Sequence, residues 1–154
     1  MILAEELKTL IVAMSPIVEL RGSIPLAIAI YNLPPWSAYV FSVIGNIIPV
    51  VLILWLLEKV SGFLSNRSAF FKKFFTWLFE RTRRRHERKF QRWQSMALVV
   101  LVAIPLPFTG AWTGSLAAFV FGISAKKAFP LISLGVLIAG IIVLLSTLGI
   151  IKIL

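Results

Sequence analysis

The sequence predicts an all-α integral membrane protein: an inverted repeat of a re-entrant helical hairpin plus a transmembrane helix, with a basic amphipathic interfacial helix between the halves. Three observations lead to this fold class. Hydrophobic residues make up 59% of the 154 residues and charged residues only 14%, whereas soluble domains average about 25% charged residues. Four hydrophobic segments are long enough to cross a bilayer, which takes roughly 18 or more residues. Two of them are interrupted by proline and glycine, and a basic stretch separates the two halves.

The four hydrophobic segments differ in regularity. They cover residues 7–30, 36–57, 96–123 and 128–151. The second and fourth have the composition of ordinary spans, although Asn46 and Pro49 interrupt the second. The first and third are broken, because a proline inside a helix removes a hydrogen bond and clashes with the preceding turn, at a cost of about 3 kcal/mol. Irregular backbone at membrane depth is tolerated only inside protein or beside a water-filled cavity, so we expect the broken segments to line a polar site.

The order of the segments predicts a single membrane domain built from two halves. The first repeat covers 7–57, the cytoplasmic linker 58–94 and the second repeat 95–154. If each broken segment is a hairpin that returns to its starting side, the halves are inverted copies, an arrangement that places transporter sites near the midplane. Both termini are then external. The acidic start, MILAEELKTL, does not have the composition of a removed signal peptide.

Basic residues are concentrated in the linker. Eleven of the sixteen Lys and Arg residues lie between Lys59 and Arg92, which predicts a cytoplasmic location by the positive-inside rule. Aromatic residues at helical spacing alternate with cations here, and this predicts an amphipathic helix over 67–93 that binds anionic lipid headgroups. Because topology already explains the net charge of +10, we expect no nucleic-acid partner. His86, the only histidine, belongs to the same solvated face.

Glu19 and Arg21 are two charges inside an otherwise apolar segment. An intramembrane charge costs about 2.5–3.5 kcal/mol on insertion scales and is by default a functional hypothesis. In a regular helix, side chains two residues apart point about 200° away from each other, but at a hairpin tip both face one cavity. Pro16 and Pro25 bracket a turn of that size. Gly22 is expected to supply permissive backbone and Ser23 to cap the second half-helix.

The third segment holds the second predicted tip, IPLPFTGAWTG, with two prolines one residue apart that should end a helix. We expect the two tips to meet at the midplane and to form a substrate or ion site. Its candidate residues are Glu19, Arg21, Gly22, Ser23, Pro25, Pro105, Pro107, Thr109, Gly110, Trp112, Thr113 and Gly114. Two alternatives stay open: that Glu19 and Arg21 only stabilise the tips, and that Gly110 and Gly114 only allow close helix packing.

The motifs ELRGSIP and PLPFTGAWTG resemble the paired signatures of the small multidrug export protein family, which is similar in hairpin architecture to the DedA and VTT-domain membrane proteins. The resemblance covers nearly the whole chain and implies two facing re-entrant hairpins surrounded by transmembrane helices. On the DedA side it also implies translocation of lipids such as polyprenyl-phosphate carriers, coupled to an ion gradient. The chain contains no Asp, so Glu19 is the only acid positioned for such coupling.

These features predict a transporter or flippase for an amphiphile with an anionic headgroup, most readily a phosphate, which Arg21 binds bidentately. The alternatives are an exporter of small hydrophobic cations with Glu19 as counter-ion, and a structural membrane protein. An intramembrane enzyme would need a nucleophile and base that the motifs do not supply; we expect no enzyme, cofactor or metal site, since Cys and Asp are absent and no phosphate-binding loop occurs. Membrane lipids are the expected partners, and the small size suggests a homodimer.

Overall fold

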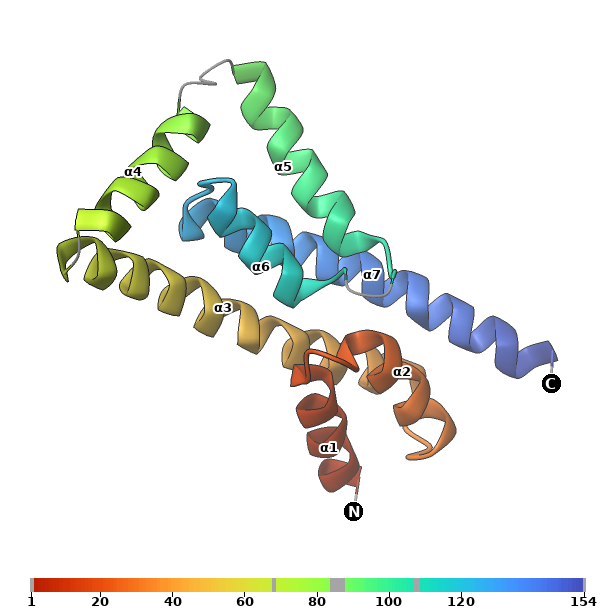
Figure 1. Cartoon of the computed structure of the whole chain (residues 1–154). Coiled ribbons are helices and arrows are strands. Elements are labelled where there is room, and N and C mark those ends of the chain that lie inside the picture. The colour runs from red at the N-terminus through yellow and green to blue at the C-terminus, as the bar shows by residue number, and fades with distance from the viewer. Residues whose placement is uncertain (1, 68, 84–87, 107–108, 154) are drawn as a thin grey trace.

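The fold of the protein is helical in the computed structural model shown in Figure 1. The structure describes residues 2–67, 69–83, 88–106 and 109–153, and within these ranges no strand occurs. The helices are α1 (Ile2–Met14), α2 (Glu19–Ala29), α3 (Pro35–Arg67), α4 (Ala69–Arg83), α5 (Arg88–Ala103), α6 (Ala111–Val120) and α7 (Ala125–Ile153). The all-α prediction is therefore confirmed for the described part of the chain.

Two of these helices are long and apolar enough to cross a membrane: Pro35–Phe63 within α3 and Ala125–Ile153, which is α7. Each has 29 residues, which at 1.5 Å per residue makes about 43 Å, more than the hydrocarbon core of about 30 Å. They correspond to the second and fourth hydrophobic segments. The first and third segments are each broken into a pair of shorter helices, α1 with α2 and α5 with α6, as the prolines and glycines predict.

The long helices exceed their predicted bounds. Helix α3 continues past Leu57, where the linker was expected to begin, and ends at Arg67. Pro49 lies inside α3 and Pro130 inside α7 without ending either helix. In both places the surrounding helices pack against the chain, and tertiary packing outweighs the local cost of one proline.

The basic linker is not one helix. The predicted helix over 67–93 is replaced by α4 and by the first turns of α5, which then continues into the third hydrophobic segment. The ring of Phe75 on α4 lies edge-on to that of Phe119 on α6, with 6.1 Å between centroids. This contact joins α4 to α6. His86 falls outside the described residues.

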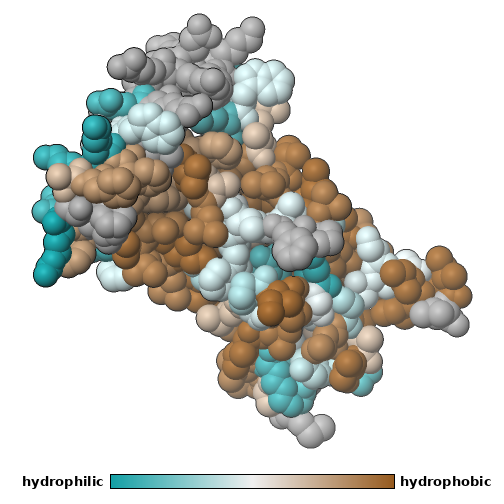
Figure 2. Space-filling view, in the orientation of Figure 1, coloured by the Kyte–Doolittle hydropathy of each residue, from teal (hydrophilic) through white to brown (hydrophobic). Residues whose placement is uncertain are grey.

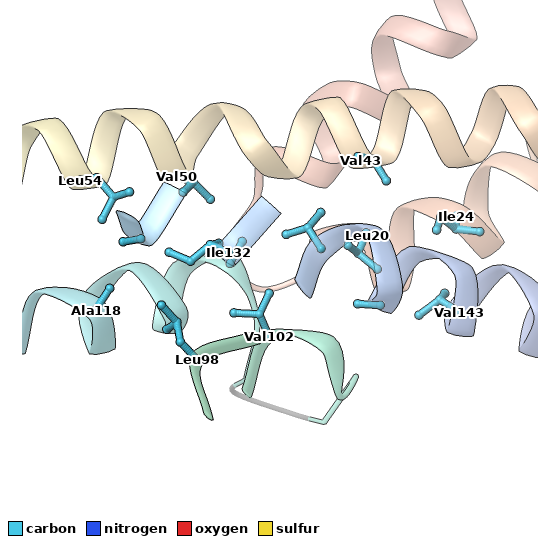
Figure 3. Packing of buried hydrophobic residues seen from close by; sticks show 14 residues of the cluster. Leu20, Ile24, Val43, Val50, Leu54, Leu98, Val102, Ala118, Ile132 and Val143 are labelled. Carbon is cyan, nitrogen blue, oxygen red and sulfur yellow. The ribbon is translucent and has the colours of Figure 1, made fainter. Parts of the chain in front are cut away.

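The hydrophobic core lies between α2, α3, α5, α6 and α7. Figure 3 shows Val43, Val50 and Leu54 of α3 above Val102 of α5 and Ile132 of α7. Small residues bring the backbones together: an added Cβ at Gly135 would lie 2.6 Å from Cβ of Val102. This close approach is the packing that small residues permit in membrane helices.

Helices α3 and α7 are also tied directly to each other. The Tyr39 hydroxyl donates to the Leu137 carbonyl at 3.1 Å, and an added Cβ at Gly140 would lie 2.7 Å from the Tyr39 ring. Near the other end of the pair, the Ala125 N–H donates to Oε1 of Glu58 at 3.2 Å. The two long helices are therefore joined at two levels.

Large apolar side chains cover the outside of the long helices. On α3 they include Leu52 and Trp55, and on α7 Ile141 and Leu145, all more than a third exposed. In Figure 2 this apolar surface forms a broad band, with hydrophilic residues gathered over α4 and near the start of α1. Such a band is the surface expected of helices that face lipid.

The predicted order of elements is present: a helix pair and a long helix, then α4, then a second pair and a second long helix. In Figure 1 the N-terminus lies at the bottom and the C-terminus at the right-hand end of α7, both away from α4. That the pairs re-enter the membrane from opposite faces, and that the halves are inverted copies, stay predictions.

Cysteine labelling tests the hairpin topology, because the chain has no cysteine. Leu3 and Asn32 flank the first helix pair and both are exposed. A re-entrant hairpin returns the chain to its starting side, so L3C and N32C should both react with a membrane-impermeant maleimide added outside the cell. S61C or K72C, near the basic end, should react only after permeabilisation. Labelling of Leu3 and Asn32 positions from opposite sides would show four simple spans instead.

Candidate functional site

The tip of the first helix pair is the turn Ser15–Val18, which contains Pro16. The Ser15 carbonyl accepts a hydrogen bond from Glu19 N–H at 3.0 Å, and the Ser15 hydroxyl accepts one from Ile17 N–H at 3.4 Å. Helix α2 begins directly afterwards, at Glu19. The turn is therefore shorter than predicted, and Pro25 lies inside α2 rather than at the far side of the tip.

Glu19 itself has the unusual backbone. Its φ is 49°, in the left-handed region, whereas Gly22 does not have a positive φ. The expectation that Gly22 supplies the permissive conformation is thus wrong. A non-glycine residue in this region costs of order 1–3 kcal/mol and is a feature of functional sites. The distortion also removes the 200° separation of a regular helix, and Nη2 of Arg21 lies 3.6 Å from Oε2 of Glu19.

The second tip connects α5 to α6 through residues 104–110. The Thr109 hydroxyl oxygen lies 2.9 Å from the Ile104 carbonyl oxygen and 2.8 Å from that of Leu106, and it accepts the Leu106 N–H at 3.2 Å. Thr109 therefore organises a connection that contains Pro105. Pro107, a predicted site residue, lies outside the described residues.

Arg21 joins the two tips. Its Nη1 donates to the Leu106 carbonyl and its Nη2 donates to the Thr109 hydroxyl at 3.3 Å. These residues are 85 and 88 positions away in the sequence. The structure thus brings the first tip against the second, and we call the meeting point of Glu19, Arg21, Leu106, Thr109, Gly110 and Trp112 the junction.

Glu19 is the buried member of the pair. Its side chain is 8% exposed, whereas that of Arg21 is 23% exposed. Its carboxylate accepts a hydrogen bond from the backbone N–H of Trp112, in the first turn of α6. No side chain of α6 caps this helix start, so Glu19 satisfies an orphan backbone donor and adds a negative charge at the positive end of the helix dipole.

Gly110 makes room for this carboxylate. An added Cβ at position 110 would overlap Oε2 of Glu19 and lie 2.7 Å from its Cδ. The backbone of Gly110, with φ 153° and ψ −160°, is in a region open essentially only to glycine. Both the conformation and the space at this position therefore require glycine.

Four other predicted site residues make contacts of their own, away from the side chains of the charged pair in the hydrogen bonds and packing described here. Ser23 does not cap α2; its hydroxyl donates to that of Ser42 on α3 at 2.7 Å, with both residues fully buried. Gly22 packs against the Val18 side chain, and Gly114 packs against Val102. Thr113 donates to the Gly110 carbonyl at 3.2 Å. The close-packing interpretation therefore holds for Gly114 but not for Gly110.

Sequence reasoning missed two contributors. The first is the Leu106 carbonyl, a backbone group. The two prolines that flank Leu106 are the sequence signal for it, because residues without N–H donors leave nearby carbonyls free.

The second is Asn46 on α3, which is 1% exposed and whose Oδ1 has no hydrogen-bond partner among the described residues. Ser42 on α3 is bonded to Ser23 on α2. Asn46 lies one turn after Ser42, and Glu19 lies one turn before Ser23. Asn46 and Glu19 are therefore at the same level of the α2–α3 helix pair. The sequence showed Asn46 only as an interruption of an apolar span.

The junction supports two interpretations. Each charge has polar partners in the opposite hairpin, as expected if the charges stabilise the tips. At the same time Arg21 is held by neutral acceptors and is partly exposed, and a carboxylate or phosphate would add an opposite charge and the bidentate geometry that a guanidinium prefers. The same guanidinium therefore has a stronger partner in any carboxylate or phosphate that reaches it.

A helical chain with two helices long and apolar enough to cross a membrane, and with a charged pair where two broken segments meet, has the features of a membrane protein. The comparison with protein families agrees with this class: the chain belongs to the family described as "Putative small multi-drug export protein", whose model matches residues 19–142. The matched range begins at Glu19 and contains the whole junction. No match was found among curated proteins or among solved structures.

Proposed function

We propose that the protein is a membrane transporter that moves an amphiphile with an anionic headgroup, such as a phospholipid or polyprenyl phosphate, through the junction. The observation that carries the proposal is the asymmetry of the charged pair. Arg21 is the more exposed partner, and its two hydrogen-bond acceptors are neutral. A ligand that approaches the junction therefore meets the guanidinium before the carboxylate.

Arg21 acts as an exchangeable link between the hairpins. In the resting state it holds the second tip through Leu106 and Thr109. A phosphate presents two oxygens in the planar geometry that guanidinium binds bidentately. When the headgroup takes over these donors, the link between the tips is released, and the second hairpin is free to move.

Glu19 controls this exchange through its proton. Ionised, it attracts Arg21 across 3.6 Å and accepts the Trp112 N–H. Protonated, it no longer competes with an anionic headgroup for the guanidinium. Binding of the headgroup and uptake of a proton by Glu19 are therefore linked, which couples transport to a proton gradient.

A second candidate function is export of small hydrophobic cations, which the family description favours. In this mechanism Glu19 is the counter-ion of the substrate and Arg21 is its partner in the resting state. The substrate cation would have to displace both Arg21 and the Trp112 N–H from a carboxylate that is 8% exposed. This burial is the reason we rank it second.

The basic end of the molecule supports binding to anionic membranes. A groove of about 450 Å³ on α4 is lined by Ala69, Lys72, Lys73, Thr76, Trp77 and Glu80. Lysines beside an exposed tryptophan suit the headgroup region of a bilayer, where each cation gains roughly 1 kcal/mol from anionic lipid. We propose that α4 lies at the cytoplasmic interface, and that two copies associate through their apolar faces.

Transport by two variants separates the candidates. In proteoliposomes, Arg21→Lys should reduce movement of a fluorescent phospholipid at least tenfold, because lysine keeps the charge but loses the planar fork. Glu19→Gln should keep the protein folded and make that movement independent of pH, since the amide fills the same volume without titrating. Both variants are also assayed with a hydrophobic fluorescent cation.

The cation-export mechanism predicts the reverse pattern: Glu19→Gln removes cation transport and Arg21→Lys is mild. Arg67→Lys and Glu80→Gln, both at exposed positions of the basic region, are the matched controls and should transport normally. Normal transport of both substrates by both junction variants would mean that the charges only stabilise the tips.

A further inference from the structure

A second groove lies at the opposite end of the molecule from α4, between α1 and the connection that leads from α2 to α3. Its volume is about 440 Å³, within the range of small-molecule sites. It is lined by Glu5, Lys8, Ile30, Tyr31, Asn32, Leu33 and Pro34. None of these lining residues belongs to the junction, so this outer groove is a separate site.

The walls of the outer groove are fixed by hydrogen bonds. Tyr31 N–H donates to the Leu26 carbonyl at 3.2 Å, and Leu33 N–H donates to that of Ala27 at 3.0 Å. The Ser37 hydroxyl donates to Oε1 of Glu6 at 2.6 Å and so ties α1 to the start of α3. The groove is therefore formed before any ligand binds.

A cation of the protein already occupies part of the groove. Nζ of Lys8 donates to Oε1 of Glu5 at 2.9 Å and lies 5.7 Å from the centroid of the Tyr31 ring. The other carboxylate oxygen of Glu5, Oε2, is buried and accepts no hydrogen bond from the described residues. The site thus combines an aromatic ring, a carboxylate with a free acceptor, and an ammonium group between them.

This combination has the chemistry that recognises organic cations. An ammonium group near an aromatic ring is attracted by the electrons of the ring face, more strongly when it is desolvated, and a carboxylate neutralises its charge. Lys8 holds this position weakly, because its side chain is 56% exposed and water screens exposed ion pairs. If the ligand also has an apolar group, that group would be buried against Ile30, Leu33 and Pro34.

We propose that the outer groove binds a hydrophobic organic ammonium ion, and that Lys8 is a built-in competitor for the same position. An anionic ligand would pair with Lys8 but would be repelled by the negative charge of the Glu5 carboxylate beside it, so the charges favour a cation. The proposal goes beyond the transport function and does not depend on which substrate passes the junction.

Calorimetric titration of the full-length protein in a non-ionic detergent with benzyltrimethylammonium tests the proposal. Removing the competitor in Lys8→Ala should tighten binding about threefold to tenfold. Glu5→Gln and Tyr31→Leu should each weaken binding by a similar factor, of the size that exposed cation–π and ion-pair contacts provide. The opposite signs of Lys8→Ala and Glu5→Gln are the signature of a tethered competitor.

Lys126→Ala is the matched control for Lys8→Ala, since Lys126 is exposed and does not line the groove. Glu19→Gln and Arg21→Lys should leave the affinity unchanged, so that failure of the junction proposal and failure of this one are distinguishable. Unchanged affinity in all three groove variants would overturn the proposal, as would weaker binding by Lys8→Ala. Binding of inorganic phosphate that is lost in Lys8→Ala would identify an anion site instead.

Discussion

Gly110→Ala should destabilise the protein by about 3 kcal/mol or more and abolish transport. The backbone conformation alone costs an alanine of order 1–3 kcal/mol. The added methyl group also overlaps the Glu19 carboxylate, which must leave both the Trp112 N–H and Arg21. Thermal unfolding of the detergent-solubilised protein, followed by tryptophan fluorescence, measures the loss.

Gly62→Ala is the matched control for this prediction. Gly62 lies in α3 with no atom near the position of an added Cβ, so alanine there should be neutral or stabilising by up to about 1 kcal/mol. In a Glu19→Ala background, Gly110→Ala should cost less, because the clash is gone and only the backbone term remains. An equal loss in both backgrounds would show that the carboxylate does not fill this space.

Arg21→Met has the second largest expected effect. It leaves the Glu19 carboxylate without its counter-charge and the Leu106 carbonyl without its donor. Removing one partner of a buried ion pair costs about 3–5 kcal/mol, and the partial exposure of Arg21 places the expected loss near the lower value. Thermal unfolding in detergent again provides the measurement.

Adding Glu19→Gln to Arg21→Met should restore much of this stability, because no unpaired charge then remains. Arg67→Met is the control; this arginine is exposed, lies 5.7 Å from the Phe63 ring at the end of α3, and should change stability by no more than about 0.5 kcal/mol. If Arg21→Met is as stable as Arg67→Met, the link between the tips contributes nothing to the fold.

The positions of the two breaks follow from the sequence, but the details of the first tip do not. Pro16 and Pro105 lie at real breaks, whereas Pro25, Pro49 and Pro130 lie inside helices. The local sequence gives each of these prolines a similar tendency to interrupt a helix interior. Whether the helix continues depends on packing from elements distant in the sequence. Local patterns therefore indicate candidate breaks without choosing among them.

The charged pair shows the same limit at the level of single residues. Its occurrence in an apolar segment marked Glu19 and Arg21 as important, and the meeting of the tips was expected. The left-handed backbone of Glu19 and the carbonyl of Leu106 were not. Both depend on the second hairpin: it supplies the helix start that Glu19 caps and the acceptors that hold Arg21. A backbone conformation or hydrogen bond that depends on two distant segments cannot be predicted from the local sequence of either segment.

The two ties between α3 and α7 determine which parts of the molecule are free to move. Because Tyr39 is fixed to Leu137 and Glu58 to Ala125 at separate levels, sliding or turning one long helix against the other would break both contacts at once. The long helices therefore form a rigid frame. Helices α5 and α6 are packed onto this frame through Val102 and Gly135, whereas the two tips meet through the side chains of Arg21 and Glu19. We therefore expect the movement that opens the junction to be confined to the tips while the long helices stay in place.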